Sequence, residues 1–130
     1  MDLTRKQVGT IGESIVSKFL TKRGFKVLAL NYWKKWGEID IIAQKKGALH
    51  FVEVKTVSCE NFDSAIKQFD RYRPEDNVHP WKLRKLHRTI ETYLSEKNVE
   101  GEWQLDMACV YLDFKNKKAK VFLTENIMLS

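Results

Sequence analysis

The segment GEIDIIAQKKGALHFVEVK, residues 37–55, constrains the fold more than any other part of this chain. Two runs rich in isoleucine, valine and phenylalanine flank Lys45-Lys46-Gly47, a pattern that predicts two antiparallel strands joined by a tight turn. Yet Asp40 lies among three isoleucines, and Glu53 lies between two valines. A carboxylate in the middle of each hydrophobic strand requires an explanation, because burying a charge is costly.

The turn determines which residues of the two strands lie opposite each other. A loop centred on Lys46-Gly47 places Asp40 opposite Glu53 and Glu38 opposite Lys55, with Cβ atoms about 4.5–5.5 Å apart in each pair. Side chains alternate between the two faces of a strand, so Asp40, Glu53 and Lys55 are expected to share one face. The same alternation predicts that three apolar residues of the first strand point to the opposite face: Ile39, Ile41 and Ala43.

Two carboxylates this close repel each other, and in a half-buried site one of them would become protonated unless a cation lay between them. Magnesium fits, since it prefers oxygen ligands and is commonly held by one or two carboxylates with water and substrate phosphate. Lys55 could then bond a metal-bound water and stabilise charge on a phosphate, which predicts phosphodiester hydrolysis. The alternative is an ordinary solvent-exposed hairpin, with Glu38 and Lys55 as a surface ion pair.

The rest of the chain supplies two helices and three further strands around the hairpin. Apolar residues recur at helical spacing in two segments, and alternating or continuous apolar runs predict the strands. Gly12, inside the first helix, is expected to let that helix approach the sheet closely. The order α-β-β-β-α-β-β predicts one α/β domain spanning residues 1–130, with a mixed sheet flanked by helices and a mobile loop at 58–79. The expected boundaries are 3–23 and 81–97 for the helices, and 25–33, 37–55 (hairpin), 103–114 and 118–127 for the strands.

The charge of the chain favours a polyanionic partner. Its net charge is +6 and its pI is near 9.3, and lysine and arginine gain affinity for phosphates by releasing condensed counterions. The apolar runs are far shorter than the roughly 18 residues that a membrane span requires, and the N-terminus lacks an apolar signal sequence. We therefore expect a cytoplasmic protein with no membrane partner.

Two groups of basic residues could contact such a polyanion. One lies on the second helix, where three residues recur at intervals of three with Arg84 nearby, so that a helix edge could follow phosphates. The other lies between Trp33 and Trp36, whose indoles could stack on exposed bases. Solvated lysines and packed tryptophans are the alternative explanation for both groups. The residues concerned are Lys82, Arg84, Lys85 and Arg88 on the helix and Lys34 and Lys35 between the tryptophans.

Several segments together resemble a known family. GTIGESIVSKFLTKRGFKVLALNY, GEIDIIA and FVEVK, in this order and spacing, are similar to the YraN-like family of small bacterial proteins, placed among the PD-(D/E)XK nucleases and similar to archaeal Holliday-junction resolvases. The resemblance spans nearly the whole chain, including the KLRKL helix and the LDMACVYL strand. It departs from the family pattern at Val57, where arginine is common, and over residues 58–76. It implies a restriction-endonuclease-like α-β-β-β-α-β core.

The resemblance also implies a role for each matching residue. Asp40 and Glu53, with the carbonyl of Val54, would bind Mg²⁺, for which Mn²⁺ could substitute. Lys55 would be the catalytic lysine, and Glu13 the acid that the first helix directs into the site. The helix geometry permits this, because Glu13 lies on the border of the apolar stripe. A solvated helix glutamate is the alternative.

These inferences lead to competing functions. The first is a magnesium-dependent endonuclease acting on DNA, and the resemblance to resolvases makes the DNA structured or branched and suits a homodimer. The alternative is a non-catalytic nucleic-acid-binding module of recombination or repair that retains the nuclease fold. A third is a purely structural interaction domain. Intact acids favour the nuclease, because a binding module gains nothing from carboxylates that repel phosphate.

Overall fold

The computed structural model describes residues 3–59, 62 and 80–128 of the chain. The predicted order of elements is confirmed within these residues, and the boundaries differ from expectation by at most a few residues. The loop expected at 58–79 lies outside the described residues, apart from Ser58, Cys59 and Phe62. The helices are α1 (Arg5–Lys22) and α3 (Pro80–Glu96), and the strands are β1 (Lys26–Lys34), β2 (Gly37–Lys45), β3 (Ala48–Ser58), β4 (Trp103–Asp113) and β5 (Lys118–Met128).

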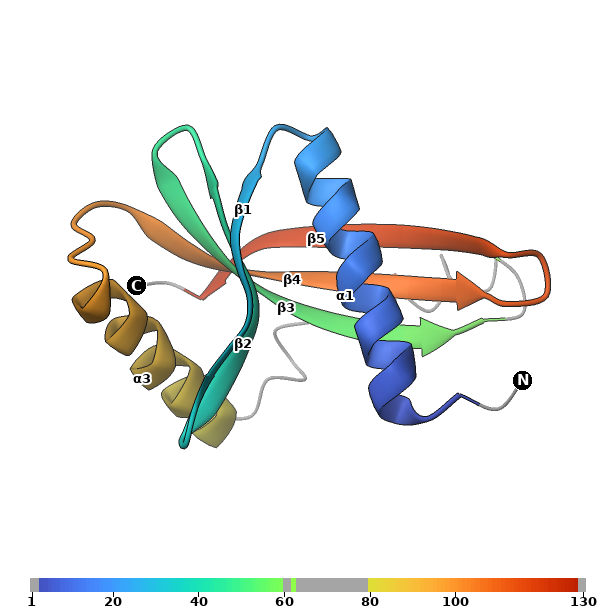
Figure 1. Ribbon diagram of the computed structural model, residues 1–130, viewed down its shortest axis with the longest axis horizontal. Coiled ribbons are helices and arrows are strands. Elements are labelled where there is room, and N and C mark those ends of the chain that lie inside the picture. Colours follow the sequence, from blue (N-terminus) through green and yellow to red (C-terminus); the bar gives the residue numbers. More distant parts are fainter. Residues whose placement is uncertain (1–2, 60–61, 63–79, 129–130) are drawn as a thin grey trace.

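The five strands form one mixed sheet in the order β1-β2-β3-β4-β5 (Figure 1). β3 and β4 run parallel, and every other neighbouring pair is antiparallel. The parallel pair follows from the long connection that contains α3, because parallel strands cannot be joined by a tight turn. The predicted α/β class is therefore confirmed, and the arrangement is consistent with a restriction-endonuclease-like core.

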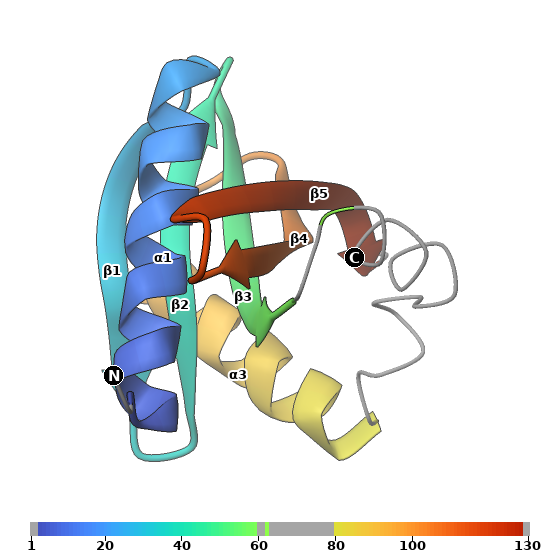
Figure 2. The same ribbon diagram turned by 90° about the vertical axis from the view of Figure 1, so that its right-hand side faces the viewer.

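Each helix covers a different face of the sheet (Figure 2). Val16 and Leu20 of α1 belong to one buried apolar cluster, and Leu86 and Ile90 of α3 belong to a second cluster on the other face. This is the layered arrangement in which a sheet buries both of its faces. None of the helices within the described ranges is long and apolar enough to cross a membrane.

Local sequence features fix α1 against the sheet. A capping box begins the helix: Gln7 N–H donates to Thr4 Oγ1 at 3.1 Å, and Thr4 N–H donates to Gln7 Oε1 at 2.8 Å. At the other end Gly24 adopts a left-handed backbone (φ 88°) just after the last turn. A Cβ atom on Gly12 would lie 1.8 Å from Thr56 Oγ1 of β3. The expected close approach of helix to sheet at Gly12 is therefore confirmed.

β2 departs from the predicted alternation at Asp40. Ile39 and Ile42 both contact the cluster beneath α3, whereas Ile41 contacts the cluster beneath α1. The prediction that Ile39 shares the face of Ile41 is therefore wrong. The change of face occurs at Asp40, between the pairs Leu30–Ile41 and Tyr32–Ile39, where Asn31 of β1 takes a left-handed backbone (φ 51°).

Candidate metal centre

β2 and β3 pair in the predicted register but separate before they reach the acids. Their ladder continues only to Ile41 opposite Val52. Beyond this pair, Asp40 Oδ2 accepts a hydrogen bond from Val54 N–H at 2.8 Å. The backbone of β3 thus holds Asp40, while the backbone of Asp40 acts to lower the pKa of Glu53.

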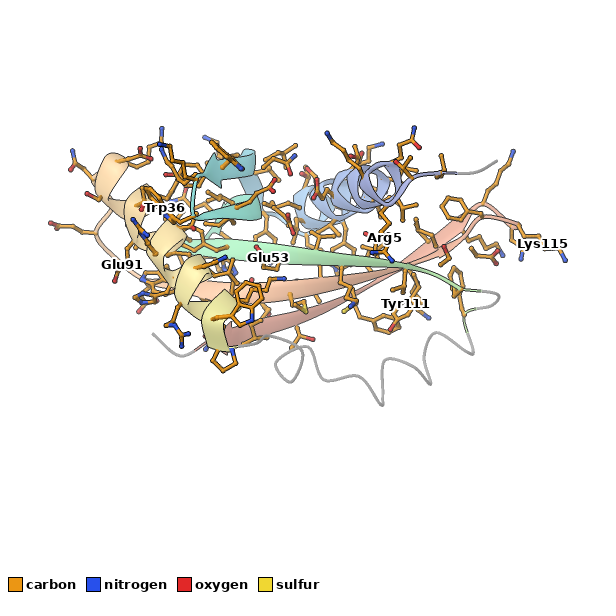
Figure 3. The ribbon with its side chains drawn as sticks, turned by 90° about the horizontal axis from the view of Figure 1, so that it is seen from below. Arg5, Trp36, Glu53, Glu91, Tyr111 and Lys115 are labelled. Carbon is orange, nitrogen blue, oxygen red and sulfur yellow. The ribbon has the colours of Figure 1, made fainter. Side chains whose placement is uncertain are left out.

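A pocket of about 360 Å³ opens between these acids and the first turns of α3. In Figure 1 the lower half of β2 turns away from β3, and the start of α3 lies beside it. Figure 3 shows Glu53 midway along β3, near α3. The lining residues are Gly37, Glu38 and Asp40 of β2, Glu53 of β3, and Trp81, Lys82, Lys85 and Leu86 of α3.

Glu53 is the most constrained of the acids. The residue is only 8% exposed, and its Oε1 atom is buried with no hydrogen-bond partner among the described residues. Burial, followed by the charge of Asp40, raises the pKa of Glu53 to about 8, although Lys82 and the Asp40 N–H act in the opposite direction. A buried oxygen without a donor requires an explanation, and a bound cation would supply one.

Two further acids approach Asp40. Burial raises the pKa of Asp40 to about 6, and the charge of Glu13 and a hydrogen bond between the two side chains raise it further, against the lowering effect of the Val54 N–H. Burial and the nearby Asp40 also raise the pKa of Glu38. The predicted convergence of Glu13 from α1 on Asp40 is therefore present in the structure.

The donor set fits a hard divalent cation. Glu53 and Asp40 offer carboxylate oxygens, and an ion between them would offset their repulsion and satisfy Glu53 Oε1. The carbonyl of Val54 lies on the same edge of β3 as its N–H, because both groups of an extended residue point the same way. It is therefore on the side of Asp40, as its predicted role as a ligand requires.

Lys55 has a different environment from the one predicted. It lies opposite Cys109 of β4, where its charge lowers the pKa of that thiol against the larger effect of burial. It is exposed and does not belong to the described residues that line the pocket. The predicted pairing of Lys55 with Glu38 is wrong, because β2 has left β3 by then and Glu38 pairs with Trp33 of β1.

The positive charge nearest the acids comes from α3. Lys82 and Lys85 line the pocket, and the charge of Lys82 lowers the pKa of both Asp40 and Glu53. Sequence reasoning placed these lysines in a helix edge that follows phosphates, and it did not place them over the acids. The helical spacing of the lysines does not reveal that they lie over the acids, because their position depends on where α3 packs against the sheet.

The other basic residues that were predicted to contact DNA differ in what surrounds them. Arg88 of α3 lies 4.1 Å from the ring centroid of Trp36, which Figure 3 shows beside α3. Lys34 pairs with Glu96 at 2.8 Å. Lys35 and Arg84 are exposed.

Two of the tryptophans remain accessible from solvent. Trp33 of β1 is 66% exposed and Trp81 at the pocket is 49% exposed, and Lys85 Nζ lies 4.7 Å from the ring centroid of Trp81. Exposed indoles next to lysines are suited to stacking on bases beside a phosphate contact.

Asn31 is a site residue that sequence reasoning missed. In the orientation that satisfies all three side chains, its amide nitrogen donates to Glu13 Oε1 at 3.1 Å and to Glu38 Oε1 at 3.0 Å. Asparagine tolerates a left-handed backbone better than most residues. That tolerance is the only signal in the sequence, and it does not reveal which side chains the amide reaches.

A second cluster has the chemistry of metal ligands. Ligand atoms of His50, Asp106 and Glu125 lie within 4.8 Å of one another. However, His50 Nδ1 lies 2.7 Å from Asp106 Oδ2, and the other Asp106 oxygen accepts from Gln104 Nε2 at 2.8 Å and Asn126 N–H at 2.9 Å. Hydrogen bonds therefore satisfy both oxygens of Asp106, and its burial requires no ion.

The known proteins that match this chain carry the same family description. The family model of "Uncharacterised protein family UPF0102" matches residues 12–110. A UPF0102 protein of Helicobacter pylori (strain HPAG1) is 40% identical over 119 residues, which cover 92% of this chain and 89% of the relative. A UPF0102 protein of Campylobacter hominis is 35% identical over 129 residues, which cover 99% of this chain and 100% of the relative. The range that matches the family includes the acids of the pocket.

Proposed function

We propose, from the premise that this chain belongs to the uncharacterised protein family UPF0102, that it is a metal-dependent endonuclease acting on DNA. The family resemblance inferred from the sequence is confirmed by these matches, but the names of the relatives state no activity. The proposal therefore depends on the site. Its main support is the buried Oε1 of Glu53, which has no hydrogen-bond partner among the described residues and lies next to Asp40.

Residues in and beside the pocket would divide the work of such a reaction. Asp40 and Glu53 would bind Mg²⁺ or Mn²⁺ with the Val54 carbonyl, and the Val54 N–H holds Asp40 in place. A bound ion would polarise a phosphate and lower the pKa of water. Glu13, which contacts Asp40, is placed to accept a proton or hydrogen bond from that water.

The basic residues suit a polyanionic substrate. Lys82 and Lys85 line the pocket opposite the acids, where they would neutralise the phosphate that is cleaved. Arg88 and the exposed Lys35 and Arg84 could extend the contact along a DNA backbone. Structured or branched DNA is the proposed substrate, and a symmetric homodimer would supply the two active sites that paired cuts require.

One observation favours a second candidate, a DNA-binding module without catalysis. Lys55, the lysine expected to stabilise the reacting phosphate, is exposed and does not line the pocket in the part of the chain that the structure describes. In the nuclease, either Lys82 takes over this role or Lys55 turns toward the bound substrate. In the binding module, neither lysine affects catalysis, because none occurs.

Cleavage assays separate these candidates. The protein is incubated with four-way-junction, flap and linear DNA in Mg²⁺ or Mn²⁺, alongside Asp40→Asn, Glu53→Gln, Lys55→Ala and Lys82→Ala. Asp40→Asn is well suited because the asparagine oxygen can still accept from Val54 N–H. Glu125→Gln is the matched control, since it removes one acid from the cluster around His50.

If the protein is a nuclease, the wild type and Glu125→Gln should cut DNA. Asp40→Asn and Glu53→Gln should not. Unchanged DNA binding by Asp40→Asn would show that chemistry alone was lost. Equal product from wild type and Asp40→Asn would identify a contaminating nuclease. Salt-sensitive DNA binding without any cutting would favour the binding module instead.

A further inference from the structure

Asn31 occupies an unusual position for a residue inside a strand. It lies on β1, directly opposite Asp40 of β2, between the paired residues Leu30–Ile41 and Tyr32–Ile39. Its backbone is left-handed (φ 51°). Non-glycine residues in this conformation are uncommon, and they concentrate at functional sites.

The side chain of Asn31 lies between two acids of the pocket region. One nitrogen contacts Glu13 Oε1 of α1 and Glu38 Oε1 of β2. An amide nitrogen carries two hydrogens and can therefore donate to both carboxylates at once. Hydrogen bonds to ionised acceptors are stronger than those between neutral groups. The bridge thus connects a helix to a strand through two acids that repel each other.

Glu13 needs such a partner to remain where it is. Its side chain reaches Asp40, and two carboxylates side by side repel each other whenever no proton or cation lies between them. The close approach at Gly12 brings the helix backbone near β3, but it does not fix the rotamer of the next residue. Among the contacts that the structure shows for Glu13, the donor from Asn31 is the one that opposes this repulsion.

We propose that Asn31 is a positioning residue of the metal centre, whose amide holds Glu13 against Asp40 and holds Glu38 at the edge of the pocket. The inference rests on the proposed function, and it adds how the acids are arranged before an ion binds. Groups that orient metal ligands by hydrogen bonds commonly change metal affinity or activity by about 10- to 100-fold when removed. Asn31 acts through Glu13 and Glu38 and does not itself contact an ion.

Because Asn31 has a left-handed backbone, its side chain can be changed by substitutions that tolerate the same backbone. Asn31→Gly keeps the conformation and removes the amide, because glycine adopts a positive φ without strain. Asn31→Asp keeps the shape and tolerates the same backbone, but it replaces a donor with an acceptor. The matched control is Asn126→Gly on β5, where φ is 57° and the backbone N–H that donates to Asp106 is retained.

Mn²⁺ affinity of each variant is measured by calorimetry and by electron paramagnetic resonance, after circular dichroism has confirmed folding. Asn31→Gly is expected to bind Mn²⁺ about 10-fold more weakly than the wild type. Asn31→Asp should be weaker still, and Asn126→Gly should bind like the wild type. In a Glu13→Ala, Glu38→Ala background, Asn31→Gly should change the affinity less than twofold, because the amide acts through these two acids.

The outcomes distinguish this inference from the proposed function. Wild-type affinity in Asn31→Gly and Asn31→Asp overturns the positioning role and leaves the metal centre intact. An equal loss in the Glu13→Ala, Glu38→Ala background also overturns it, because the effect would then be structural. A wild type that binds no Mn²⁺ overturns the proposed metal centre and this inference together.

Discussion

Replacing Glu53 with glutamine should stabilise the metal-free protein at neutral and alkaline pH. In the wild type, burial and the nearby Asp40 raise the pKa of Glu53 from its ordinary value of 4.5 to about 8. Glutamine has nearly the same shape and carries no charge. Its amide nitrogen can donate toward the Asp40 carboxylate.

The sign of the effect follows from proton linkage. Because the pKa is raised on folding, the folded state keeps a proton that the unfolded state loses as the pH rises above 4.5. Unfolding therefore becomes easier as the pH rises, until the folded state also ionises near pH 8. Each pKa unit corresponds to 1.36 kcal/mol, so the free energy of unfolding should fall by about 3–4 kcal/mol between pH 5 and pH 8. Glutamine at position 53 removes this loss.

Urea denaturation at pH 5, 7 and 8 in a chelating buffer measures the effect. The stability of Glu53→Gln relative to the wild type should increase by about 3 kcal/mol over this range. Adding Mn²⁺ should reverse the order: at 100 times its dissociation constant, an ion that binds only the folded state stabilises it by about 2.7 kcal/mol. A difference between the two proteins that does not change with pH would show that Glu53 is not held in a desolvated site.

Three other predictions test the surroundings of the site. Gly12→Ala should destabilise the protein by about 2–3 kcal/mol in urea denaturation, because the added methyl group would collide with β3; wild-type stability would contradict the close approach. Asp106→Ala should cost about 3 kcal/mol or more by the same measurement, because it leaves His50 and a backbone N–H without their buried acceptor, and a loss below 1 kcal/mol would refute the network. Lys82→Ala should reduce the slope of log affinity for DNA against log salt concentration by about 0.9 in filter binding. An equal reduction in Arg84→Ala, which changes an exposed residue, would show that Lys82 contributes no more to DNA binding than another surface charge of α3.

Much of the fold could be predicted because the signals are local. Lys46-Gly47 marks the hairpin turn, and a turn fixes the register of the strands that it joins. The apolar period of α3 and the glycine that follows α1 mark the helices in the same way. Such signals depend on residues close together in the sequence, and they do not require the packing of distant segments to be known.

The rest of the site depends on how distant segments pack. Nothing in the sequence near Asp40 reveals that β2 pairs with β3 only from Ile41 onward. The left-handed backbone of Asn31 beside Asp40 was not foreseen either, and a strict alternation of faces therefore placed Ile39 wrongly. The acids meet Lys82 only because α3 crosses the face where β2 has turned away. Tertiary geometry decides these contacts, and sequence patterns set only the period of each element.

The central claim is that a divalent ion lies between Asp40 and Glu53. A crystal of the protein soaked in Mn²⁺ and measured at a wavelength that gives anomalous scattering from manganese tests it directly. The account predicts one peak within about 2.2 Å of a carboxylate oxygen of each acid and of the Val54 carbonyl oxygen. A peak at His50 and Glu125 with none at Asp40 would contradict it, as would a fully soaked crystal without a peak.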